Sequence, residues 1–305
     1  MRIAVVVNPA ARAGAHRGTA NAGAAIRAVE RLRAHGHTVT VISGGSAAET
    51  SALIRTALEV GTDAVAVVGG DGTVSLAAQE LAGTGVPLGL IPTGTGNDFA
   101  AHLGIPQLEP ELAADVIDRG ITRTTDLARV TRADGTTHAY TTVLASGFDS
   151  AVNDRANRMR WPRGDLRYTV ALLLEFVFLK ALPFTMHVDG ERIDGPFVLA
   201  AVGNTRTYGG GIPICPAARA DDGVLEVTVV RPHGRLHLLR LLPTVYKGTH
   251  VDLAEVETYR GRSIRLEAPG VTAYADGDPI AALPITIDAE PGALTVFAPA
   301  EADAV

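Results

Sequence analysis

Two glycine-rich loops hold the residues of this chain that are best suited to chemistry. The first, Gly69-Gly70-Asp71-Gly72-Thr73, follows a short apolar run and precedes a stretch whose apolar residues have helical spacing. Its glycines let backbone N–H groups approach a ligand closely, and a helix N-terminus adds partial positive charge, so the loop predicts an anion site. An aspartate would repel a bare phosphate, so Asp71 indicates a bound cation, most simply Mg²⁺.

A second loop of the same kind, Pro92-Thr93-Gly94-Thr95-Gly96-Asn97, follows the next apolar run. Thr73, Ser75 and Thr95 offer hydroxyls to phosphate or ribose oxygens, although a hydroxyl after a glycine turn often serves only as a helix cap. One such turn is weak evidence. Two at successive strand ends, one acidic and one rich in hydroxyls, favour a nucleotide site over two ordinary turns.

Phosphoryl transfer also needs a group that accepts the proton of the acceptor hydroxyl. The stretch Tyr274-Ala275-Asp276-Gly277-Asp278-Pro279 offers two carboxylates for this role. The alternative is that Asp-Gly only forms a hairpin turn here. Burial would help a carboxylate base, because desolvation raises its pKa.

Composition and absent motifs disfavour several classes of protein. A chain of 305 residues, 47% of them hydrophobic, predicts a globular protein of two domains. The net charge of −6 gives no global positive field, so no nucleic-acid partner is expected. No GxxxxGKS or GxxxxGKT sequence occurs and no GxGxxG follows the first strand, which disfavours P-loop proteins and dinucleotide dehydrogenases. Cys215 is the only cysteine and the first apolar run, residues 3–7, is too short for a signal peptide, so a cytoplasmic protein is expected.

Alternating elements must place the two loops at one edge of a sheet. The hydrophobic pattern predicts strands at about 3–7, 38–42, 64–68 and 87–91, and helices at about 19–35, 46–60 and 73–83. This alternation predicts a doubly wound parallel sheet with helices on both faces. Ligands bind beyond the carboxyl ends of such strands, where Asn8 and both glycine loops fall. A further helix at about 109–119 precedes the expected domain boundary at residue 127.

The remainder of the chain consists of short β-rich segments separated by Gly, Pro or Asp, which predicts an antiparallel β-sandwich-like domain. These segments lie at about 127–131, 138–145, 184–189, 196–202, 224–230, 263–267, 271–275 and 293–298. We therefore expect an α/β protein. An N-terminal doubly wound parallel-sheet nucleotide-binding domain over 1–127 is followed by the sandwich-like domain over 128–305.

An arginine-rich stretch precedes the longest apolar segment, residues 166–184. Charged residues interrupt that segment, so a core helix is favoured over a membrane span. Arginines beside a tryptophan fit an anionic membrane surface, and a solvated arginine-rich helix is the alternative. The residues expected to make transient peripheral membrane contact are Arg155, Arg158, Arg160, Trp161 and Arg163.

GGDGT at 69–73 followed by PTGTGNDFA at 92–100 resembles the diacylglycerol kinase catalytic family, soluble bacterial lipid kinases related to sphingosine and ceramide kinases. Other motifs fall in that family's order, namely Asn8-Pro9, Asp126, Gly203-Asn204, Gly209-Gly210-Gly211, Asp221-Asp222-Gly223 and Ala275-Asp276-Gly277-Asp278. The resemblance implies a lipid kinase that uses ATP and Mg²⁺ at the inner membrane face. Its acceptor would be the hydroxyl of a membrane lipid, with diacylglycerol the first choice and phosphatidic acid the product, and the second domain would receive the lipid.

The resemblance also implies roles for individual residues. Asp71, Asp276 and Asp278 would be catalytic, with Asp278 standing where the family usually has glutamate, so whether Asp276, Asp278 or a bridging water takes the proton stays open. Ser75-Leu76 stands where the family often has Asn-Glu, which puts any contact of those longer side chains in doubt. The metal ligands would be Asp71, Asp126 and Asp222, with the backbone carbonyls of Arg219 and Val224. The nucleotide-binding residues would be Asn8, Ser43, Gly69, Gly70, Asp71, Gly72, Thr73, Val74, Ser75, Thr93, Gly94, Thr95, Gly96 and Asn97.

Two other functions stay open from the sequence. Another GGDGT-type kinase, such as an NAD kinase or a phosphofructokinase, would act on a soluble acceptor, but it should lack the GTGND loop paired with a late ADGD turn. A decayed nucleotide- or lipid-binding module would bind without turnover, and it would not need Asp276 and Asp278. The sequence does not distinguish diacylglycerol from a sphingoid base, ceramide or a polyprenol as acceptor, and it leaves a homodimer and the nucleotide preference undecided.

Overall fold

The computed structural model describes residues 1–7, 15–148, 151, 152, 155, 159, 170 and 181–300. The chain forms two compact units. Unit 1 comprises Met1–Leu127 together with Pro291–Val305, and unit 2 comprises Ala128–Glu290.

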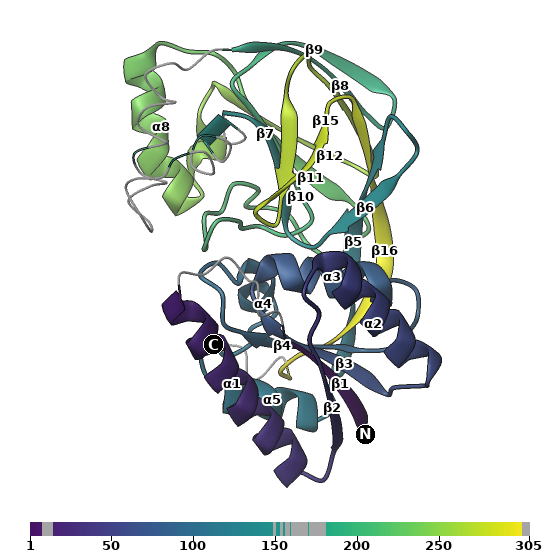
Figure 1. Ribbon diagram of the computed structural model, residues 1–305. Coiled ribbons are helices and arrows are strands. Elements are labelled where there is room, and N and C mark those ends of the chain that lie inside the picture. Colours follow the sequence, from purple (N-terminus) through teal and green to yellow (C-terminus); the bar gives the residue numbers. More distant parts are fainter. Residues whose placement is uncertain are drawn as a thin grey trace. The chain divides into compact units, whose positions relative to one another are not determined.

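Unit 1 is a parallel sheet between two layers of helices (Figure 1). Its strands pair in the order β2-β1-β3-β4, all in parallel. Helices α1 and α5 pack together on one face, and α2 and α3 on the other. The predicted doubly wound sheet is confirmed. The elements are β1 (Arg2–Val7), α1 (Ala15–Ala34), β2 (Thr38–Ile42), α2 (Ala47–Glu59), β3 (Ala64–Gly69), α3 (Asp71–Leu81), β4 (Leu88–Pro92), α4 (Asp98–His102) and α5 (Pro110–Asp118).

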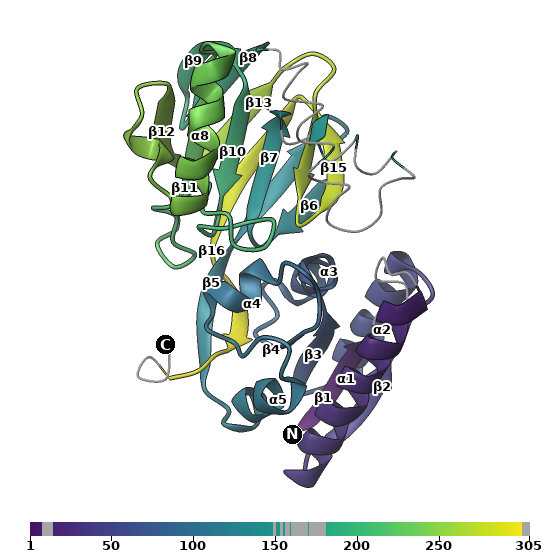
Figure 2. The same cartoon turned by 90° about the vertical axis from the view of Figure 1, so that its left-hand side faces the viewer.

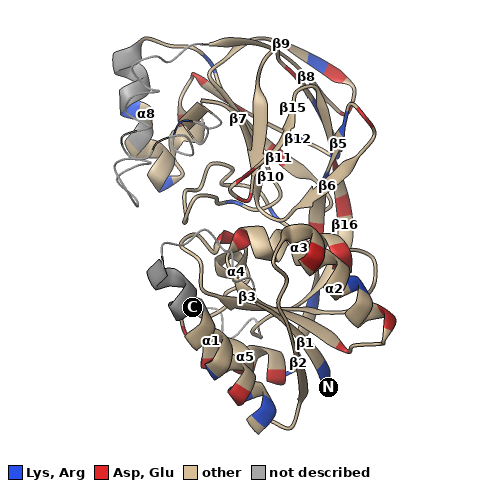
Figure 3. Ribbon diagram, in the orientation of Figure 1, with Lys and Arg blue, Asp and Glu red and all other residues tan. Residues whose placement is uncertain are grey.

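Burial of aliphatic side chains holds these layers together. Every residue of β3 is buried, as expected for a central parallel strand. Each long helix contributes a side chain with at most 1% exposure, namely Leu32 from α1, Ile54 from α2, Leu81 from α3 and Ile117 from α5. Charged residues lie side by side along α1 and α5 (Figure 3), where Arg31 pairs with Asp115 at 2.6 Å. Because partly exposed ion pairs contribute little, the helix layers depend mainly on burial.

The C-terminal strand, β16 (Ile285–Phe297), completes unit 1. Val296 pairs in parallel with Leu88, and the N–H of Ala298 donates to the carbonyl of Ile121 at 3.1 Å. Residues 291–305 are expected from the sequence in the second domain, whereas they belong to unit 1 in the structure. A short apolar segment shows that a strand forms but not which sheet receives it, and this explains the difference.

Unit 2 is an antiparallel sandwich, as predicted. One of its sheets has the order β12-β11-β10-β7-β14-β15, and the other contains β16-β13-β8-β9 with β5 and β6. Tyr140, Phe184, Phe197 and Leu225 are among the buried residues of the core between them. The elements are β5 (Thr122–Arg132), β6 (Thr137–Tyr140), β7 (Val143–Gly147), β8 (Leu182–Val188), β9 (Glu191–Phe197), β10 (Leu199–Gly203), β11 (Leu225–Val230), α8 (Arg235–Lys247), a 3-10 turn (His250–Asp252), β12 (Val256–Gly261), β13 (Ser263–Glu267), β14 (Thr272–Ala275) and β15 (Asp278–Ala282).

Several elements of this unit are not predicted from the sequence. They are strands β9 (apart from its last two residues), β12 and β15 and helix α8. The sequence also predicts one strand over 138–145, where the structure has β6 and β7 in different sheets. Thr141 and Thr142 stand between the two strands, and as β-branched residues they suit a continuous strand. The break is set by Asp276, more than 130 positions away, which accepts hydrogen bonds from both of their N–H groups.

Most of the apolar segment 166–184 lies outside the described residues, and its last residues begin β8 instead of ending a helix. Among the residues that the structure describes, no helix has the length and apolar character needed to cross a bilayer.

Helix α8 and the loop over 204–224 cover the outer face of the β10–β11 region (Figure 2). Glu226 of β11 lies beneath this cover with 2% exposure. Its Oε2 has no hydrogen-bond partner among the described residues. Burial raises the pKa of Glu226, against the lowering effects of the Ala217 N–H and the charges of Arg260 and Arg206.

We predict that Glu226→Gln stabilises the protein at pH 8. The unfolded chain releases this proton near its ordinary pKa, so the stability that Glu226 contributes is present below about pH 4.5 and is lost as the pH rises through the higher folded-state pKa. The urea midpoint of the variant should therefore exceed that of the wild type at pH 8, and the gap should narrow toward pH 4.5. Glu257→Gln is the matched control with the opposite sign, because Arg231 lowers the pKa of Glu257. A difference in urea midpoint that does not change with pH would contradict a raised pKa of Glu226 in the folded protein.

Candidate functional site

The first glycine loop joins β3 to α3, as the sequence predicts, although the helix begins at Asp71, earlier than expected. Gly70 caps the helix in extended conformation, and its carbonyl accepts from the N–H groups of Thr73 at 3.0 Å and Val74 at 3.1 Å. A Cβ at Gly69 would lie 2.9 Å from the Thr73 side chain, so a larger residue does not fit there. The loop therefore presents the start of a helix at the carboxyl edge of the sheet.

The second glycine loop lies directly against the first. The N–H of Thr93 donates to the carbonyl of Gly69 at 3.0 Å. A Cβ at Gly94 would lie 2.7 Å from Cα of Gly70 and 2.7 Å from Oδ1 of Asn97. Gly94 is therefore required by close backbone approach, whereas a Cβ at Gly70 would make a tight contact of 3.2 Å with Cα of Gly94. The predicted proximity of the two loops is present in unit 1.

Asn97 holds the second loop closed. Its Oδ1 accepts from the Gly94 N–H at 2.9 Å, and its Nδ2 donates to the Gly94 carbonyl at 3.0 Å. The residue is 5% exposed and adopts a left-handed conformation with φ of 55°. These contacts give Asn97 a structural task, and its predicted contact with a nucleotide stays a prediction.

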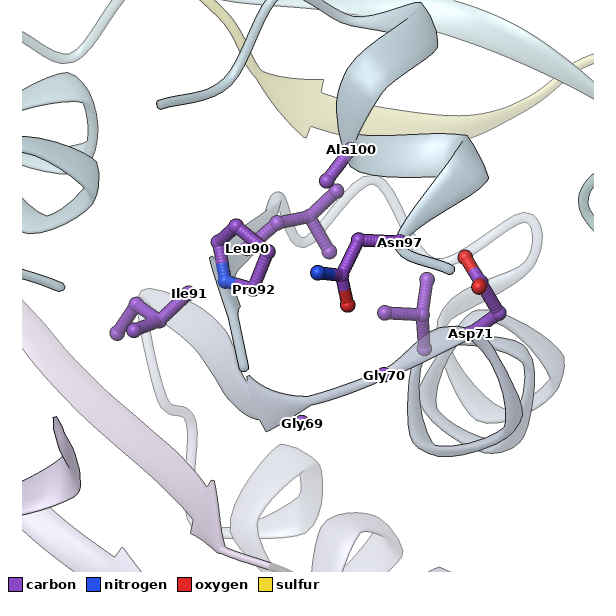
Figure 4. A pocket seen from close by; sticks show the side chains of 9 residues that line it. Gly69, Gly70, Asp71, Leu90, Ile91, Pro92, Asn97 and Ala100 are labelled. Atoms are coloured by element: carbon purple, nitrogen blue, oxygen red, sulfur yellow. The ribbon is translucent and has the colours of Figure 1, made fainter. Parts of the chain in front are cut away.

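A narrow crevice lies between the loops (Figure 4), and it is too tight to admit a water molecule. A nucleotide would therefore have to lie over the loops and not inside the crevice, because ordinary small-molecule sites enclose roughly 300–1,000 Å³. The Asp71 carboxylate points toward the start of α4, where its Oδ1 accepts from the Phe99 N–H at 3.3 Å. The lining residues are Gly69, Gly70, Asp71, Val74, Leu90, Ile91, Pro92, Asn97 and Ala100. Leu90, Ile91, Pro92 and Ala100 are absent from the sequence-based site, because nothing in an apolar strand shows which residue faces a ligand.

Thr93 supplies the clearest sign of a ligand. Its Oγ1 is buried and has no hydrogen-bond partner among the described residues. Leaving such a hydroxyl unsatisfied costs about 1–3 kcal/mol, and a phosphate or ribose oxygen would remove that cost. The residues present therefore fit a nucleotide.

The other predicted nucleotide contacts have varied surroundings. Ser43 is exposed directly after β2, at the carboxyl edge of the sheet, and Thr95 is exposed in the second loop. Thr73 and Ser75 are 5% and 4% exposed. Gly72 is exposed and Gly96 half-buried, and Asn8 lies outside the described residues.

The predicted metal ligands are not gathered into a carboxylate cluster. Across the described ranges, no group of three or more His, Cys, Asp or Glu side chains is arranged for a metal ion. Asp126, 4% exposed on β5, accepts from the Gly292 N–H at 2.8 Å. Asp71 therefore fits Mg²⁺ only if phosphate or water oxygens complete the coordination, and a shared network of Asp71 and Asp126 stays a prediction.

The turn predicted to bind a structural metal has other contacts. Oδ1 of Asp222 accepts from the Val224 N–H at 3.2 Å, and its Oδ2 pairs with Arg260. The Arg219 guanidinium pairs with Asp221 at 3.0 Å. These contacts do not fit a metal at Asp222, whose role as a ligand stays a prediction.

The second candidate region is the hairpin turn between β14 and β15 in unit 2. Asp276 and Gly277 have φ of 48° and 87°, and Ala275 pairs with Asp278 across the turn. The Asp276 carboxylate accepts from both residues that link β6 to β7. Its Oδ2 accepts from the Thr141 N–H at 3.1 Å, and its Oδ1 from the Thr142 N–H at 3.3 Å and hydroxyl at 2.5 Å. Asp276 thus holds the junction between β6 and β7, and its partners Thr141 and Thr142 are not predicted from the sequence.

The same junction is held from the end of β10. Nδ2 of Asn204 donates to the Thr141 carbonyl at 2.9 Å, and its backbone N–H donates to the Thr142 carbonyl at 2.8 Å. A Cβ at Gly203 would lie 2.6 Å from Cβ of Cys215. The Gly203-Asn204 motif therefore has a packing reason and a hydrogen-bonding reason in this structure.

Asp278 differs from Asp276 in its surroundings. It is the first residue of β15, and its side chain is exposed. The desolvation expected for a catalytic carboxylate is therefore not provided by the residues of unit 2. Of the residues predicted to contact a membrane, Arg155 is half-buried, and Arg158, Arg160, Trp161 and Arg163 lie outside the described residues.

Comparison with known proteins matches both units. The model of the diacylglycerol kinase catalytic domain matches residues 2–130, and that of the YegS C-terminal NAD kinase beta sandwich-like domain matches residues 142–298. A diacylglycerol kinase of Mycobacterium tuberculosis is 49% identical over 282 residues, covering 91% of each chain. A probable lipid kinase YegS-like of Stenotrophomonas maltophilia is 33% identical, covering 81% of this chain and 82% of its own. The crystal structure of a diacylglycerol kinase from Bacillus anthracis str. Sterne, at 20% identity, covers 98% of this chain and 97% of its own with a TM-score of 0.69.

We predict that Gly94→Ala weakens ATP binding at least about tenfold. The added methyl group would push the loops apart, because it meets both Gly70 and Asn97 at 2.7 Å, and overpacking of this kind costs about 1–3 kcal/mol. Isothermal titration with MgATP measures the change. Gly23→Ala in α1 is the control, since its nearest neighbour would lie 3.8 Å away. If Gly94→Ala binds MgATP as tightly as the wild type, the close approach of Gly94 to Gly70 does not determine the shape of the nucleotide site.

A second prediction separates the two aspartates of the β14–β15 turn. Asp276→Ala should lower the free energy of unfolding by about 3 kcal/mol, because it leaves the buried N–H groups of Thr141 and Thr142 without their acceptor. Asp278→Ala, at an exposed position, should change it by less than about 0.5 kcal/mol. Urea denaturation of both variants measures the difference. Equal stabilities would refute a structural role for Asp276.

Proposed function

Because this chain belongs to the diacylglycerol kinase catalytic family, we propose that it transfers the γ-phosphate of ATP to the hydroxyl of a membrane lipid, with diacylglycerol as acceptor and phosphatidic acid as product. The observation that carries the proposal is the pair of touching glycine loops, which combine Asp71 with the unsatisfied hydroxyl of Thr93. Relatives that span most of the chain and are named lipid kinases favour a lipid over the soluble acceptors of NAD kinases.

Unit 1 would bind and orient the nucleotide. Backbone N–H groups at the start of α3 and the Thr93 hydroxyl would donate to phosphate oxygens, and Asp71 would hold Mg²⁺. Bound MgATP would supply the phosphoryl group, and its Mg²⁺ would neutralise negative charge that develops during transfer. We assign Asp126 a supporting role near this ion, following its predicted place in the family.

Asp278 would accept the proton of the lipid hydroxyl. The carboxylate oxygens of Asp276 already accept from the Thr141–Thr142 junction, whereas Asp278 is exposed to an incoming acceptor. This contrast favours Asp278 over Asp276 as the base. Retention of a carboxylate at Asp278 also argues against a decayed binding module.

We further propose that the protein works in lipid metabolism at the cytoplasmic face of the membrane. The predicted surface of transient contact comprises Arg155, Arg158, Arg160, Trp161 and Arg163. A homodimer is compatible with this placement and is not required by it.

The proposal predicts transfer of labelled phosphate from ATP with Mg²⁺ into one lipid of a detergent-dispersed panel containing diacylglycerol, sphingosine, ceramide and a polyprenol. Asp278→Asn should lower the rate by about 100-fold or more, since acid–base groups contribute about 10²–10⁴. Asp71→Asn should also lower the rate, because it removes the carboxylate proposed to hold Mg²⁺. Asp252→Asn, at an exposed position in the 3-10 turn, is the matched control. Label only in added NAD or fructose 6-phosphate would overturn the lipid acceptor. ATP binding without label in any acceptor would favour the binding module.

A further inference from the structure

We propose that Arg132 is a positioning residue for Asp278. The inference rests on the proposed role of Asp278 and concerns the strand that carries it. Nothing in the motifs that point to a kinase involves Arg132, which ends β5 in the other sheet of unit 2.

Strand β15 is poorly fixed by its own sheet. It lies at the end of the strand order, and β14 is its ladder partner in the described part of the chain. Pro279, directly after Asp278, has no N–H to donate. The register then shifts, with Tyr274 opposite Pro279 and Ala273 opposite Ala281, so Ile280 is the extra residue of a β-bulge. A bulge leaves its residue unpaired and redirects the strand, so a restraint at Ile280 would act on the position of Asp278.

Arg132 provides that restraint. Its Nε donates to the carbonyl of Ile280 at 3.0 Å, which links β5 of one sheet to the bulge in the other. The guanidinium is itself held, because Nη1 donates to Oγ1 of Thr136 at 3.1 Å and the Thr136 hydroxyl donates to Asp134 at 2.6 Å. Asp278 therefore lies between two anchors. Asp276 holds the turn before it, and Arg132 holds the bulge after it.

The charges around Asp278 also act on the pKa of His138, so this pKa offers a second measurement of the role of Arg132. His138 of β6 is half-buried, and its pKa is lowered mainly by burial and by the charge of Arg132, with a smaller lowering effect of Arg129. The negative charge of Asp278 on β15 acts in the opposite direction. Arg129 is paired with Glu290 of β16. Loss of the Arg132 charge should therefore raise the pKa of His138.

The test compares Arg132→Gln, Arg132→Lys and Arg129→Gln in the full chain. Arg132→Gln should lower kcat for the lipid acceptor about 10- to 100-fold with the KM for ATP unchanged, because a small misplacement of a reacting group has effects of this size. Arg132→Lys should recover part of the rate, since its ammonium can also donate to Ile280. Arg129→Gln removes a nearby charge without touching β15, and its kcat should stay within twofold. Amide hydrogen exchange of residues 278–282 should accelerate in Arg132→Gln, and the NMR titration of His138 should move to higher pH.

The outcomes separate the two proposals. If Asp278→Asn abolishes transfer while Arg132→Gln stays within twofold of the wild type, the positioning role is overturned and the proposed function stands. The positioning role would also be overturned if kcat falls equally in Arg132→Gln and Arg129→Gln. It would likewise be overturned if amide hydrogen exchange of residues 278–282 is unchanged in Arg132→Gln. If the wild type phosphorylates no lipid, or if Asp278→Asn is fully active, the proposed function fails instead. Melting curves of each variant exclude unfolding as the cause, and Arg132→Lys replaces Arg132→Gln if the latter is unfolded.

Discussion

The arrangement around the candidate base depends on the carboxylate of Asp276. Where β6 ends and β7 begins, the chain leaves one sheet for the other, and the N–H groups of Thr141 and Thr142 lose their place in either ladder. Asp276 accepts from both. Buried N–H groups without acceptors are costly, so this carboxylate permits the strand break itself. Asp189 does the same at the β12–β13 junction, where it accepts from the N–H groups of Arg262 and Ser263.

The two turns show that an aspartate in an Asp-Gly turn can have a structural role without a catalytic one. Asp189 and Asp276 share φ of 48°, a following glycine and a carboxylate turned onto a neighbouring strand junction. Asp189-Gly190 lies in the turn between β8 and β9 and belongs to none of the motifs that point to a kinase. An aspartate in such a turn therefore needs no catalytic explanation. Asp278 does not share these contacts, and for this reason it is the better candidate.

Periodic sequence patterns predict the elements of unit 1 and much of unit 2, because burial on one face imposes those patterns. These patterns do not predict which strands pair with one another. The stretch over 138–145 suits a single strand because Thr141 and Thr142 are β-branched. The low hydrophobicity of β12 hides a strand whose inner residues alternate between half-buried and exposed positions. The glycine loops could be found because close approach demands glycine at Gly69 and Gly94. Thr141, Thr142, Arg132 and the apolar wall of the crevice could not, since their roles arise from contacts between distant parts of the chain.

The return of residues 291–298 to unit 1 makes that unit discontinuous in sequence, with the whole of unit 2 inserted into it. During synthesis, all of unit 2 leaves the ribosome before the strand that pairs with β4. Unit 2 can thus begin to fold as one continuous segment, while the sheet behind the glycine loops still lacks its last strand. The candidate nucleotide loops acquire their final support only after the whole of unit 2 has been synthesised, so a ribosome that stops shortly before residue 291 releases a chain without that support.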